Sequence, residues 1–542
     1  MDISQNILKW YPFRENSSVL EIYDEKSILT KINKNIQIDT CNIKNIRIDG
    51  LYDYITLIGT FEYAPIILEE EKCYSSFLSM LRNHLKPNGI IIIAIDNRLG
   101  VKYLTGAKSS KYSYIFEGME SKIQKGKPNL LLKQEITKFI KEAGFKNFKF
   151  YYPLPDYKFT SSIFSDEFLP TSDHSKILYP VKYEEGSMIL YNEINILKQI
   201  CDMGEFEKFT NSYLVEISDN EIENNTQFVN YNIFRKDKYK LLLTINGNKV
   251  QKVAENDEAN THIEKIKSNI AKLKELGFNV LEEVKENKII SEFVKEKELD
   301  KLLIETIEQK DTNTFKEKIK DWYEYIKEKL TKNNNIKKDV FEKYNIKVPD
   351  EIKNMLTFVE NGYIDLAFEN VFYKDGYLLY DQEWYLENVP LEFILYRSIN
   401  NLYTYNSIKL ERKISKEEIY GEFNLKQYEV YFEELEKKIQ DEILDKTFVE
   451  KYQNEIGKYY KRIENFKTEI KQKEEEIEQK ERKIEEIQRS LEEIINAEQM
   501  KYKELENTKN EIEKKYNELL HEYNTSRGWK VIKTIRKVVR KK

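Results

Sequence analysis

The chain has 542 residues, of which 40% are apolar and 34% are charged, which suits two or three domains with hydrophobic cores beneath a densely charged surface. Its formal net charge of −6 argues against nucleic-acid binding by the protein as a whole. Three cysteines, Cys41, Cys73 and Cys201, lie too far apart to predict a metal knuckle or a disulfide framework. None of the four histidines has the spacing of a metal site, so His174 and His262 are expected to be surface or capping residues.

The N-terminal residues show no signal-peptide pattern. No uncharged run approaches the roughly 20 residues that a membrane-spanning helix requires. We therefore expect a protein of the cytoplasm that is neither exported nor integral to a membrane.

Strands and helices alternate from Ser18 to about Pro170. Apolar runs at 18–23, 52–63 and 90–95 predict strands, and residues 69–86 predict a helix. Short apolar strands separated by helices indicate a doubly wound, largely parallel sheet, with a binding site at the carboxyl ends of its strands. The run 90–95 is apolar on both faces, as expected of a central strand.

Three segments of this region resemble a known family: YDYITLIGTFEYAP (52–65), LKPNGIIIIAIDNRLGVKYLTGA (85–107) and AGFKNFKFYYPLPDYKFTSSIFSDEFLP (143–170). They are similar to the methyltransferase domain of bacterial proteins that modify or terminate surface polysaccharides of the O-antigen type. The resemblance implies a Rossmann-like class I methyltransferase domain that uses S-adenosylmethionine (SAM), and such proteins can pair it with a kinase-like domain. It also implies methylation, and in some members phosphorylation, of the sugar end of a growing glycan.

The sequence departs from this pattern after the first strand. Class I methyltransferases place a glycine-rich turn there, because the backbone must approach the methionine part of the cofactor closely. Here Glu21 leads into YDEKSI without a glycine. Only about 30 residues separate Glu21 from Asp53, and Asp39 is a poor candidate for binding the ribose. We expect a shortened sheet with a damaged cofactor pocket, serving as a scaffold.

Candidate residues can still be named for this domain. If the pocket binds SAM, we expect Glu21, Gly59 and Glu62 to line it. Asp96, Asn97 and Arg98 end the strand at 90–95, where they would face a methyl acceptor or, equally well, form a strand-ending turn.

The segment 363–384, YIDLAFENVFYKDGYLLYDQEW, has the spacing that phosphoryl transfer needs. Asp365 and Asn370 lie five positions apart, and Asp381 follows a short apolar strand at 377–380. A phosphoryl donor is highly anionic, so its site needs a base for the acceptor hydroxyl and oxygen ligands for Mg²⁺. We predict Asp365 as catalytic base and Asn370 and Asp381 as metal ligands in an α+β, protein-kinase-like domain. The alternative is a set of turn residues.

Upstream positions supply candidates for nucleotide binding. Lys252, in the strand-like run KVQKVA, is expected to grip phosphates, and Glu258 at the start of the next helix to hold the lysine, with Glu264 as its rival. The backbone of Glu292, Phe293 and Val294 could bond a nucleotide base.

Two features of this domain depart from protein kinases. The hairpin before the lysine strand contains only Gly247, so no glycine-rich loop covers the phosphates. DQEW stands in place of DFG, which favours a small molecule or sugar over a protein as substrate, by analogy.

From 454 to 523 the composition shifts to Glu, Lys, Ile and Gln without proline. Every seventh position from Ile456 is apolar in nine of ten cases, which predicts a coiled coil that joins copies of this chain. At 1.5 Å per residue the rod would extend about 105 Å.

The last 17 residues combine an apolar face with eight positive charges. The face consists of Trp529, Ile532, Ile535 and Val539, and the charges include Lys530, Lys533, Arg536 and Lys537. Such a helix is typical of an anionic lipid interface. The alternative is a basic tail that binds nucleic acid or an acidic partner. Family resemblance also points to the inner face of the cytoplasmic membrane.

These patterns predict a methyltransferase-like domain (1–181), a kinase-like domain (182–415), a helical connector (416–453), a coiled coil (454–525) and a membrane-binding helix (526–542). Our leading hypothesis is a membrane-associated transferase of surface-glycan biosynthesis that uses ATP and Mg²⁺ and acts on a glycan or glycolipid. One alternative is an inactive oligomeric scaffold that recruits a glycosyltransferase. Another is a SAM-dependent methyltransferase whose kinase-like half binds substrate.

Overall fold

The computed structural model describes residues 3–32, 34–68, 73–120, 127–187, 192–331, 338–454, 471–473, 477, 480, 501–525, 528–529, 531–532 and 535–536. The chain divides into two compact units, the first made of 1–223 with 450–542 and the second of 224–449. The first unit therefore extends past the domain end predicted at 181. Most of the predicted helical connector, 416–449, belongs to the second unit.

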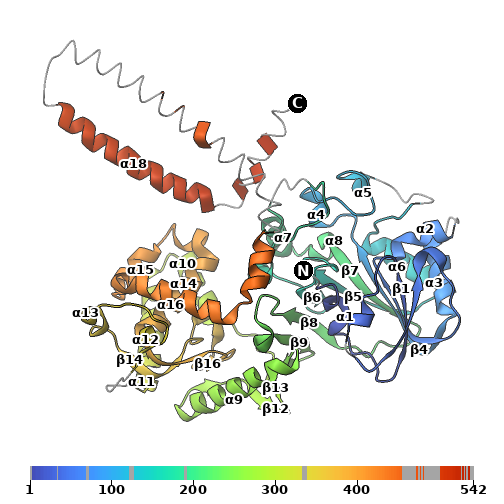
Figure 1. The fold of residues 1–542 in the computed structure, drawn as a ribbon, viewed down its shortest axis with the longest axis horizontal. Coiled ribbons are helices and arrows are strands. Elements are labelled where there is room, and N and C mark those ends of the chain that lie inside the picture. The colour runs from blue at the N-terminus through green and yellow to red at the C-terminus, as the bar shows by residue number, and fades with distance from the viewer. Residues whose placement is uncertain are drawn as a thin grey trace. The chain divides into compact units, whose positions relative to one another are not determined.

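A mixed sheet forms the centre of the first unit (Figure 1). Its described strands are, in spatial order, β2 (Gln37–Asn42), β1 (Ser18–Tyr23), β3 (Tyr52–Ile58), β4 (Leu85–Asp96), β7 (Ser212–Ser218), β5 (Asn147–Leu154) and β6 (Ser162–Ser165). Strands β2, β1, β3 and β4 are parallel, whereas β7 is antiparallel to both β4 and β5. The predicted α/β sheet is confirmed, but only the half formed by β2, β1, β3 and β4 is parallel, and the half formed by β7, β5 and β6 is antiparallel.

The strand order locates a binding edge in this sheet. The chain passes from β1 outward to β2 and then returns to the other side of β1 as β3. Ligands of open α/β sheets bind outside the carboxyl ends of the strands at such a reversal. Residues 91–95 of β4 are completely buried, as expected of a central strand covered on both faces.

Short helices surround the sheet. The α-helices of this region are α1 (Asn6–Lys9), α2 (Ala64–Ile67), α3 (Cys73–Arg82), α4 (Val101–Leu104), α5 (Glu117–Glu120), α6 (Lys133–Glu142), α7 (Glu193–Asp202) and α8 (Phe206–Phe209). Its 3₁₀ helices are η1 (Leu29–Lys31), η2 (Ile43–Asn45), η3 (Phe61–Tyr63) and η4 (Ser172–Ile177). Helix α3 packs on α6, where the rings of Tyr74 and Phe139 stack at 4.9 Å.

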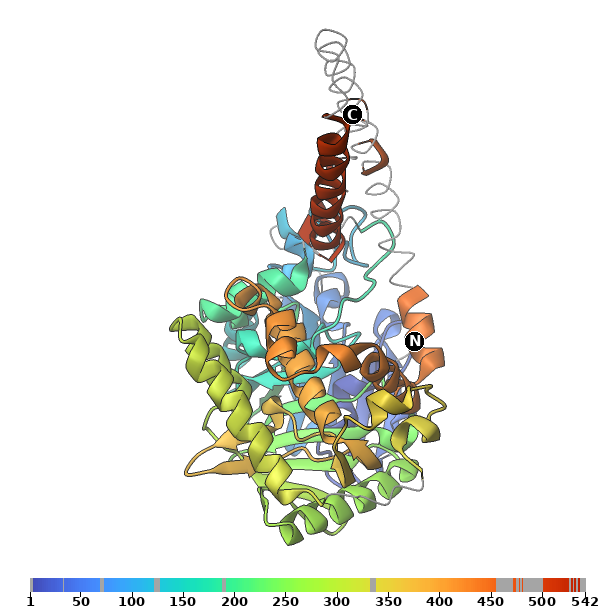
Figure 2. The same ribbon diagram turned by 90° about the vertical axis from the view of Figure 1, so that its left-hand side faces the viewer.

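The second unit begins with antiparallel strands. They lie in the order β8 (Thr226–Tyr231), β9 (Leu241–Asn246), β10 (Lys249–Ala254), β13 (Lys288–Glu292) and β12 (Glu283–Lys285). Helix α9 (Asn260–Glu275) runs beside β10, β12 and β13 (Figures 1 and 2). Its apolar positions Ile263, Ile266, Ile270 and Leu273 are buried, the three-to-four spacing of a helix with one buried face.

The rest of the second unit is mainly helical. Its helices are α10 (Leu299–Glu308), α11 (Thr312–Lys329), α12 (Val340–Lys343), α13 (Asp350–Lys353), α14 (Leu391–Leu410), α15 (Lys416–Glu422) and α16 (Glu429–Ile443). Two small sheets accompany them, β11 (Asn279–Val280) with β16 (Tyr377–Leu379) and β15 (Val371–Tyr373), and β14 (Phe358–Tyr363) with β17 (Tyr385–Pro390). The 3₁₀ helices of this unit are η5 (Asp237–Tyr239), η6 (Asp257–Ala259), η7 (Phe368–Asn370) and η8 (Lys426–Tyr428).

Much of the predicted coiled coil, including 455–470 and 481–500, lies outside the described residues. Within it, α18 (Lys501–Thr525) is a helix. Its heptad residues Ile512 and Leu519 are exposed, so the apolar stripe is uncovered in the single chain. Strand number and partner remain predictions.

Only part of the predicted membrane helix is described. Trp529, Ile532, Ile535 and Arg536 are helical, whereas Lys530, Lys533, Lys537 and Val539 lie outside the described residues. Across the part of the chain that the structure describes, no helix combines the length and apolarity needed to cross a bilayer.

Candidate functional site

At the carboxyl edge of the first sheet, the turn after β1 is held by a buried carboxylate. Glu21 accepts hydrogen bonds from the backbone amides of Ile28 (2.6 Å) and Leu29 (3.2 Å), and from the hydroxyl of Ser27. The side chain therefore fixes the glycine-free turn that follows β1. This corrects the prediction that Glu21 lines a cofactor pocket.

Gly59 follows β3 and is required there. Its φ is +70°, and a Cβ would lie 2.5 Å from the hydroxyl of Tyr157, closer than any side chain tolerates. The Gly59 carbonyl accepts a hydrogen bond from Lys111 Nζ (3.1 Å), which also donates to Tyr63 Oη (3.1 Å). Tyr63 in turn donates to Asp24 (2.7 Å), which follows β1. The chain's own side chains thus bridge the ends of β1 and β3.

Glu62 is the unusual residue at this edge. It is completely buried, and neither carboxylate oxygen has a hydrogen-bond partner among the described residues. Burial raises the pKa of Glu62 to about 7, although nearby Lys111 opposes the shift. A buried polar group without a partner is rare and costly, so Glu62 is the strongest sign of a polar ligand position in this unit.

As a whole, this edge fits SAM poorly. The amides after β1 are bonded to Glu21, and the carbonyl after β3 is bonded to Lys111. Backbone groups that a cofactor would need are therefore already satisfied. Damage to the cofactor pocket stays a prediction, which this bonding favours.

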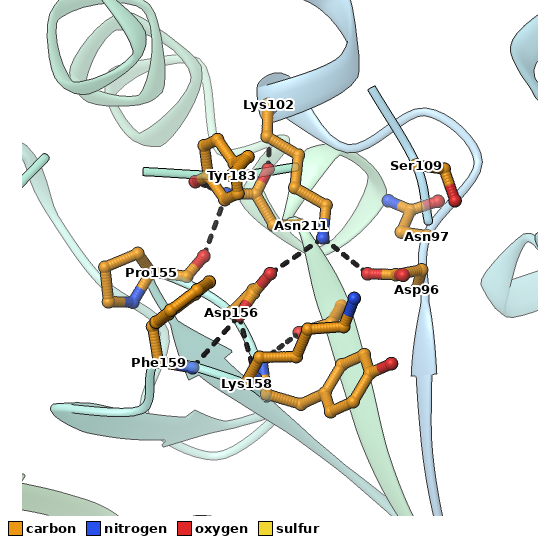
Figure 3. A network of polar contacts seen from close by, with 12 residues as sticks. Asp96, Asn97, Lys102, Ser109, Pro155, Asp156, Lys158, Phe159, Tyr183 and Asn211 are labelled. Atoms are coloured by element: carbon orange, nitrogen blue, oxygen red, sulfur yellow. Dashed lines mark hydrogen bonds and ion pairs between the residues drawn. The ribbon is translucent and has the colours of Figure 1, made fainter. Parts of the chain in front are cut away.

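A second polar network lies where β4 ends (Figure 3). Lys102 Nζ stands between two carboxylates, at 2.5 Å from Asp96 and 2.8 Å from Asp156. The three side chains are only 4%, 1% and 1% exposed. Burial opposes the charge on Lys102, but the two aspartates outweigh it and raise the lysine pKa well above its ordinary value.

The neighbours of Asp96 are also structural. Asn97 donates from Nδ2 to the carbonyls of Lys208 (2.9 Å) and Thr210 (2.7 Å), and Arg98 pairs with Glu135 (2.7 Å). These contacts favour the strand-ending turn for Asp96, Asn97 and Arg98, and their acceptor role stays a prediction. Their polar groups hold the end of β4 to the segments around it, which is the turn alternative.

In the second unit, Lys252 projects from β10 into a group of three carboxylates. Its Nζ pairs with Asp381, lies 3.3 Å from Glu282 and lies 3.9 Å from Glu383. Lys252, Glu282 and Glu383 are at least 91% buried, but the side chain of Asp381 is 38% exposed. This group, the Lys252 cluster, therefore opens to solvent at Asp381.

Glu282, between β11 and β12, makes the contact with Lys252 that was predicted for Glu258. Glu258 is exposed in η6, and the rival Glu264 is exposed and pairs with Lys267. One carboxylate oxygen of Glu282 contacts Lys252, and the other accepts a hydrogen bond from the backbone amide of Asp381 (2.9 Å). Nothing in the run LEEV marks this residue, since the contact depends on how the turn folds over β10.

Asp365 lies beside this cluster. Its Oδ2 accepts hydrogen bonds from the backbone amides of Glu383 (2.9 Å) and Trp384 (2.7 Å). Its Oδ1 accepts a longer hydrogen bond from Arg397 Nη1 (3.3 Å). Burial raises the pKa of Asp365 to about 7, with Arg397 opposing it. A carboxylate has about four acceptor positions, so one remains for a further proton donor.

Asn370 and Gln382, the residue after Asp381, both bond to the carbonyl of Asp365. Asn370 Nδ2 donates to the Asp365 carbonyl (3.1 Å), and Gln382, next to Asp381, donates to the same oxygen (2.9 Å). Burial raises the pKa of Asp381 to about 6. Asp365 and Asn370 are thus joined directly, and Asp381 is linked to them through its neighbour Gln382.

Binding of Mg²⁺ with a nucleotide stays a prediction for this site. Among the described residues no group of three or more His, Cys, Asp or Glu side chains is arranged for a metal. Mg²⁺, however, is usually held by one or two protein oxygens together with substrate phosphates. The Asp381 carboxylate and the Asn370 amide oxygen would supply them.

The predicted base-binding segment lies between β13 and α10. Glu292 is the last residue of β13, and Val294 lies just beyond it. The Phe293 amide is already used, since it donates to the Asn248 carbonyl (3.0 Å). Of this segment, only backbone groups of Glu292 and Val294 stay candidates for a base.

Sequence reasoning missed the residues that support the cluster from behind. Glu383 accepts from Arg235 (2.5 Å) and contacts His262 (3.3 Å). His262 is 2% exposed and lies against the ring of Trp384 at 4.8 Å. It is a core residue, which corrects the expectation of a surface or capping histidine.

No family model and no curated protein matches the chain. Solved structures similar to it include a SAM-dependent methyltransferase from Archaeoglobus fulgidus (11% identity, covering 40% of this chain and 92% of that chain, TM-score 0.23). Others are a SAM-dependent methyltransferase from Clostridium acetobutylicum (10%, 38% and 84%, TM-score 0.20) and PKMT2 from Rickettsia typhi in complex with AdoHcy (14%, 41% and 53%, TM-score 0.19). TM-scores of this size assign no activity to this chain.

Proposed function

We propose that the second unit is a phosphotransferase that uses ATP and Mg²⁺. The contact between Lys252 and Asp381 carries this proposal, because it sets a cation for phosphates beside a partly exposed metal-binding carboxylate. Asp365 receives the acceptor proton, Asn370 and Asp381 hold the metal, and Glu282 orients Lys252. ATP bound with Mg²⁺ supplies the phosphoryl group.

The acceptor in this proposal is the sugar end of a surface glycan or glycolipid. The family resemblance of the first unit supports this class, and the basic, apolar-faced tail supports work at the inner face of the cytoplasmic membrane. The coiled coil joins copies of the chain and holds the two units away from the lipid.

The first unit serves in this proposal as a scaffold. The bonding of Glu21 and Lys111 at its binding edge favours that role over SAM-dependent methylation. The second candidate, a wholly inactive scaffold that recruits a glycosyltransferase, is favoured by the absence of a glycine-rich loop before Lys252.

Calorimetric titration of the full chain with Mg-ATP tests the main proposal. We expect binding in the native protein and at least about a hundredfold weaker binding or transfer in Asp381→Asn, because a metal ligand is lost. Asp375→Asn, in the exposed turn between β15 and β16, is the matched control and should bind normally. No binding by the native chain rejects the phosphotransferase and leaves the scaffold.

The pH dependence of transfer tests Asp365 separately. A base must be unprotonated, so the rate should rise as the pH passes about 7, the pKa to which burial raises Asp365. Asp365→Asn should abolish this rise together with transfer. A pH-independent rate between 5 and 9 would contradict the base assignment.

Flotation with anionic liposomes tests the membrane assignment. The native chain should float, and a chain lacking Arg527 to Lys542 should stay behind, because the charges and the apolar face are lost together. Equal flotation of both chains would show that the tail is not the anchor.

A further inference from the structure

The second unit contains a cavity of about 310 Å³ behind the Lys252 cluster. We call it the α9 cavity. It is formed by one face of α9, the segment 383–386, the end of α12 and the end of α16. Its side chains include Tyr239, His262, Lys265, Lys272, Lys343, Tyr344, Glu383, Trp384, Tyr385 and Glu442. None of the roles proposed above uses this space.

Aromatic and cationic groups share the lining. Tyr239 and Trp384 meet edge to face at 4.9 Å, and Lys272 Nζ lies 5.3 Å from the centre of the Tyr385 ring. Aromatic faces bind flat or ring-shaped apolar surfaces, while lysine ammonium groups bind phosphate as point charges. The lining therefore offers both halves of a site for a phosphorylated ring.

The charge balance also favours an anion. Three lysines, Lys265, Lys272 and Lys343, line the cavity. Of the two lining carboxylates, Glu383 is already paired with Arg235, whereas Glu442, which accepts a hydrogen bond from the hydroxyl of Tyr344 (2.8 Å), keeps its negative charge against the three lysines. Positive charge is therefore in excess at the wall.

One wall of the cavity is shared with the proposed catalytic group. Glu383 faces the cavity and lies 3.9 Å from Lys252, and the Trp384 amide holds the carboxylate of Asp365. A ligand that shifts this wall would change the position of both Lys252 and Asp365. The cavity and the Lys252 cluster are therefore mechanically linked.

We propose that the α9 cavity binds a small phosphorylated ring compound, either a sugar phosphate or a nucleoside monophosphate, and that binding changes the affinity of the Lys252 cluster for Mg-ATP. The second clause rests on the proposed phosphotransferase. The first stands without it.

Binding is tested by calorimetry of the full chain without Mg²⁺, using glucose 1-phosphate, AMP and inorganic phosphate as probes. At least one of the two ring phosphates should bind, and more tightly than inorganic phosphate. The double variant Lys265→Gln/Lys272→Gln should weaken that binding about tenfold or more, since two charge-assisted contacts are lost. Lys267→Gln, an exposed lysine of α9 outside the lining, should have no effect.

Further arms separate the cavity from the catalytic group. Asp381→Asn should bind the ring phosphate as the native chain does. Tighter binding there would place the probe at the Lys252 cluster, where the substitution removes the carboxylate that competes for Lys252, and would overturn the proposal. Failure of both ring phosphates to bind, or equal affinity in the double variant, would also overturn it. A saturating ring phosphate should shift the Kd for Mg-ATP at least about threefold, a typical coupling. An unchanged Kd would remove the second clause, whereas no Mg-ATP binding at all would reject the phosphotransferase and leave the cavity site standing.

Discussion

Lys102 in the first unit and Lys252 in the second are both buried lysines placed among carboxylates, but they differ in access to solvent. Lys102 lies between two aspartates whose side chains are each 1% exposed. Lys252 pairs with Asp381, whose side chain is 38% exposed. Burying an ion pair completely makes it a structural connection, while leaving one member open lets a ligand compete for it. Both sites pair a lysine with carboxylates, and they differ in the solvent exposure of a carboxylate partner.

The two units also differ in how their polar groups are satisfied. At the edge of the first sheet, Glu21 and Lys111 are bonded to the chain's own backbone. In the second unit, Asp365 and Asp381 keep raised pKa values, about 7 and about 6, because burial leaves their charges incompletely balanced. Such imbalance is common at functional sites. Buried Glu62 of the first unit also has a raised pKa, about 7, so the difference between the units lies in the cation: Lys252 pairs directly with Asp381, whereas the Glu62 carboxylate has no hydrogen-bond partner among the described residues.

Removing Lys102 should have the largest effect on stability. In Lys102→Met the carboxylates of Asp96 and Asp156 lose their shared cation, so we expect a loss of about 3–5 kcal/mol of unfolding free energy. Urea denaturation, with hydrogen exchange followed in peptides of β4, measures this. Lys158→Met, whose side chain is 31% exposed beside the same network, is the matched control and should cost under about 1 kcal/mol. A loss of unfolding free energy as small as that expected for Lys252→Met would contradict the structural role of Lys102.

Glu62→Gln should stabilise the protein at neutral and alkaline pH. The folded pKa of Glu62, about 7, lies above the ordinary 4.5, so the unfolded chain loses this proton first and stability falls as pH rises between these values. The glutamine variant escapes this penalty, which amounts to about 3 kcal/mol above pH 7. Denaturation at pH 4 and pH 8 measures the difference, which should vanish at the lower pH. A gain that is equal at both would mean that Glu62 does not titrate as its burial demands.

Lys252→Met is the counterpart of the Lys102 substitution. Here Glu383 keeps Arg235, and Asp381 is partly solvated, so we expect a smaller stability loss of about 1–2 kcal/mol. Affinity for Mg-ATP should nevertheless fall at least about tenfold, because the phosphates lose their cation. Denaturation and calorimetry on the same sample measure both effects. The comparison breaks if stability collapses while nucleotide binding is unaffected.

Arg98→Ala should have the smallest effect. The ion pair with Glu135 is partly exposed, and such pairs contribute under about 1 kcal/mol. Thermal unfolding should therefore change little. A large loss would show that the end of β4 depends on this pair as strongly as on Lys102.

Local sequence patterns were sufficient to predict some parts of this protein. The predicted strands at 18–23 and 90–95 became β1 and the buried centre of β4, and the unbroken apolar run at 90–95 is what a strand covered on both faces needs. The D-x4-N spacing brought Asn370 into contact with Asp365, and the short strand before Asp381 placed its neighbour Gln382 on the same carbonyl, because these residues lie in one compact stretch of chain.

The pairing of charged side chains that lie far apart in the sequence depends on the tertiary fold. Lys252 meets Glu282 rather than Glu258, although both lie within about 30 residues of it. Asp96 shares a cation with Asp156, 60 positions away. A carboxylate in a sequence shows no sign of its future neighbours. Its role depends on burial and on the charges that folding places within a few ångströms, because both the cost of desolvation and the strength of an ion pair depend on that geometry.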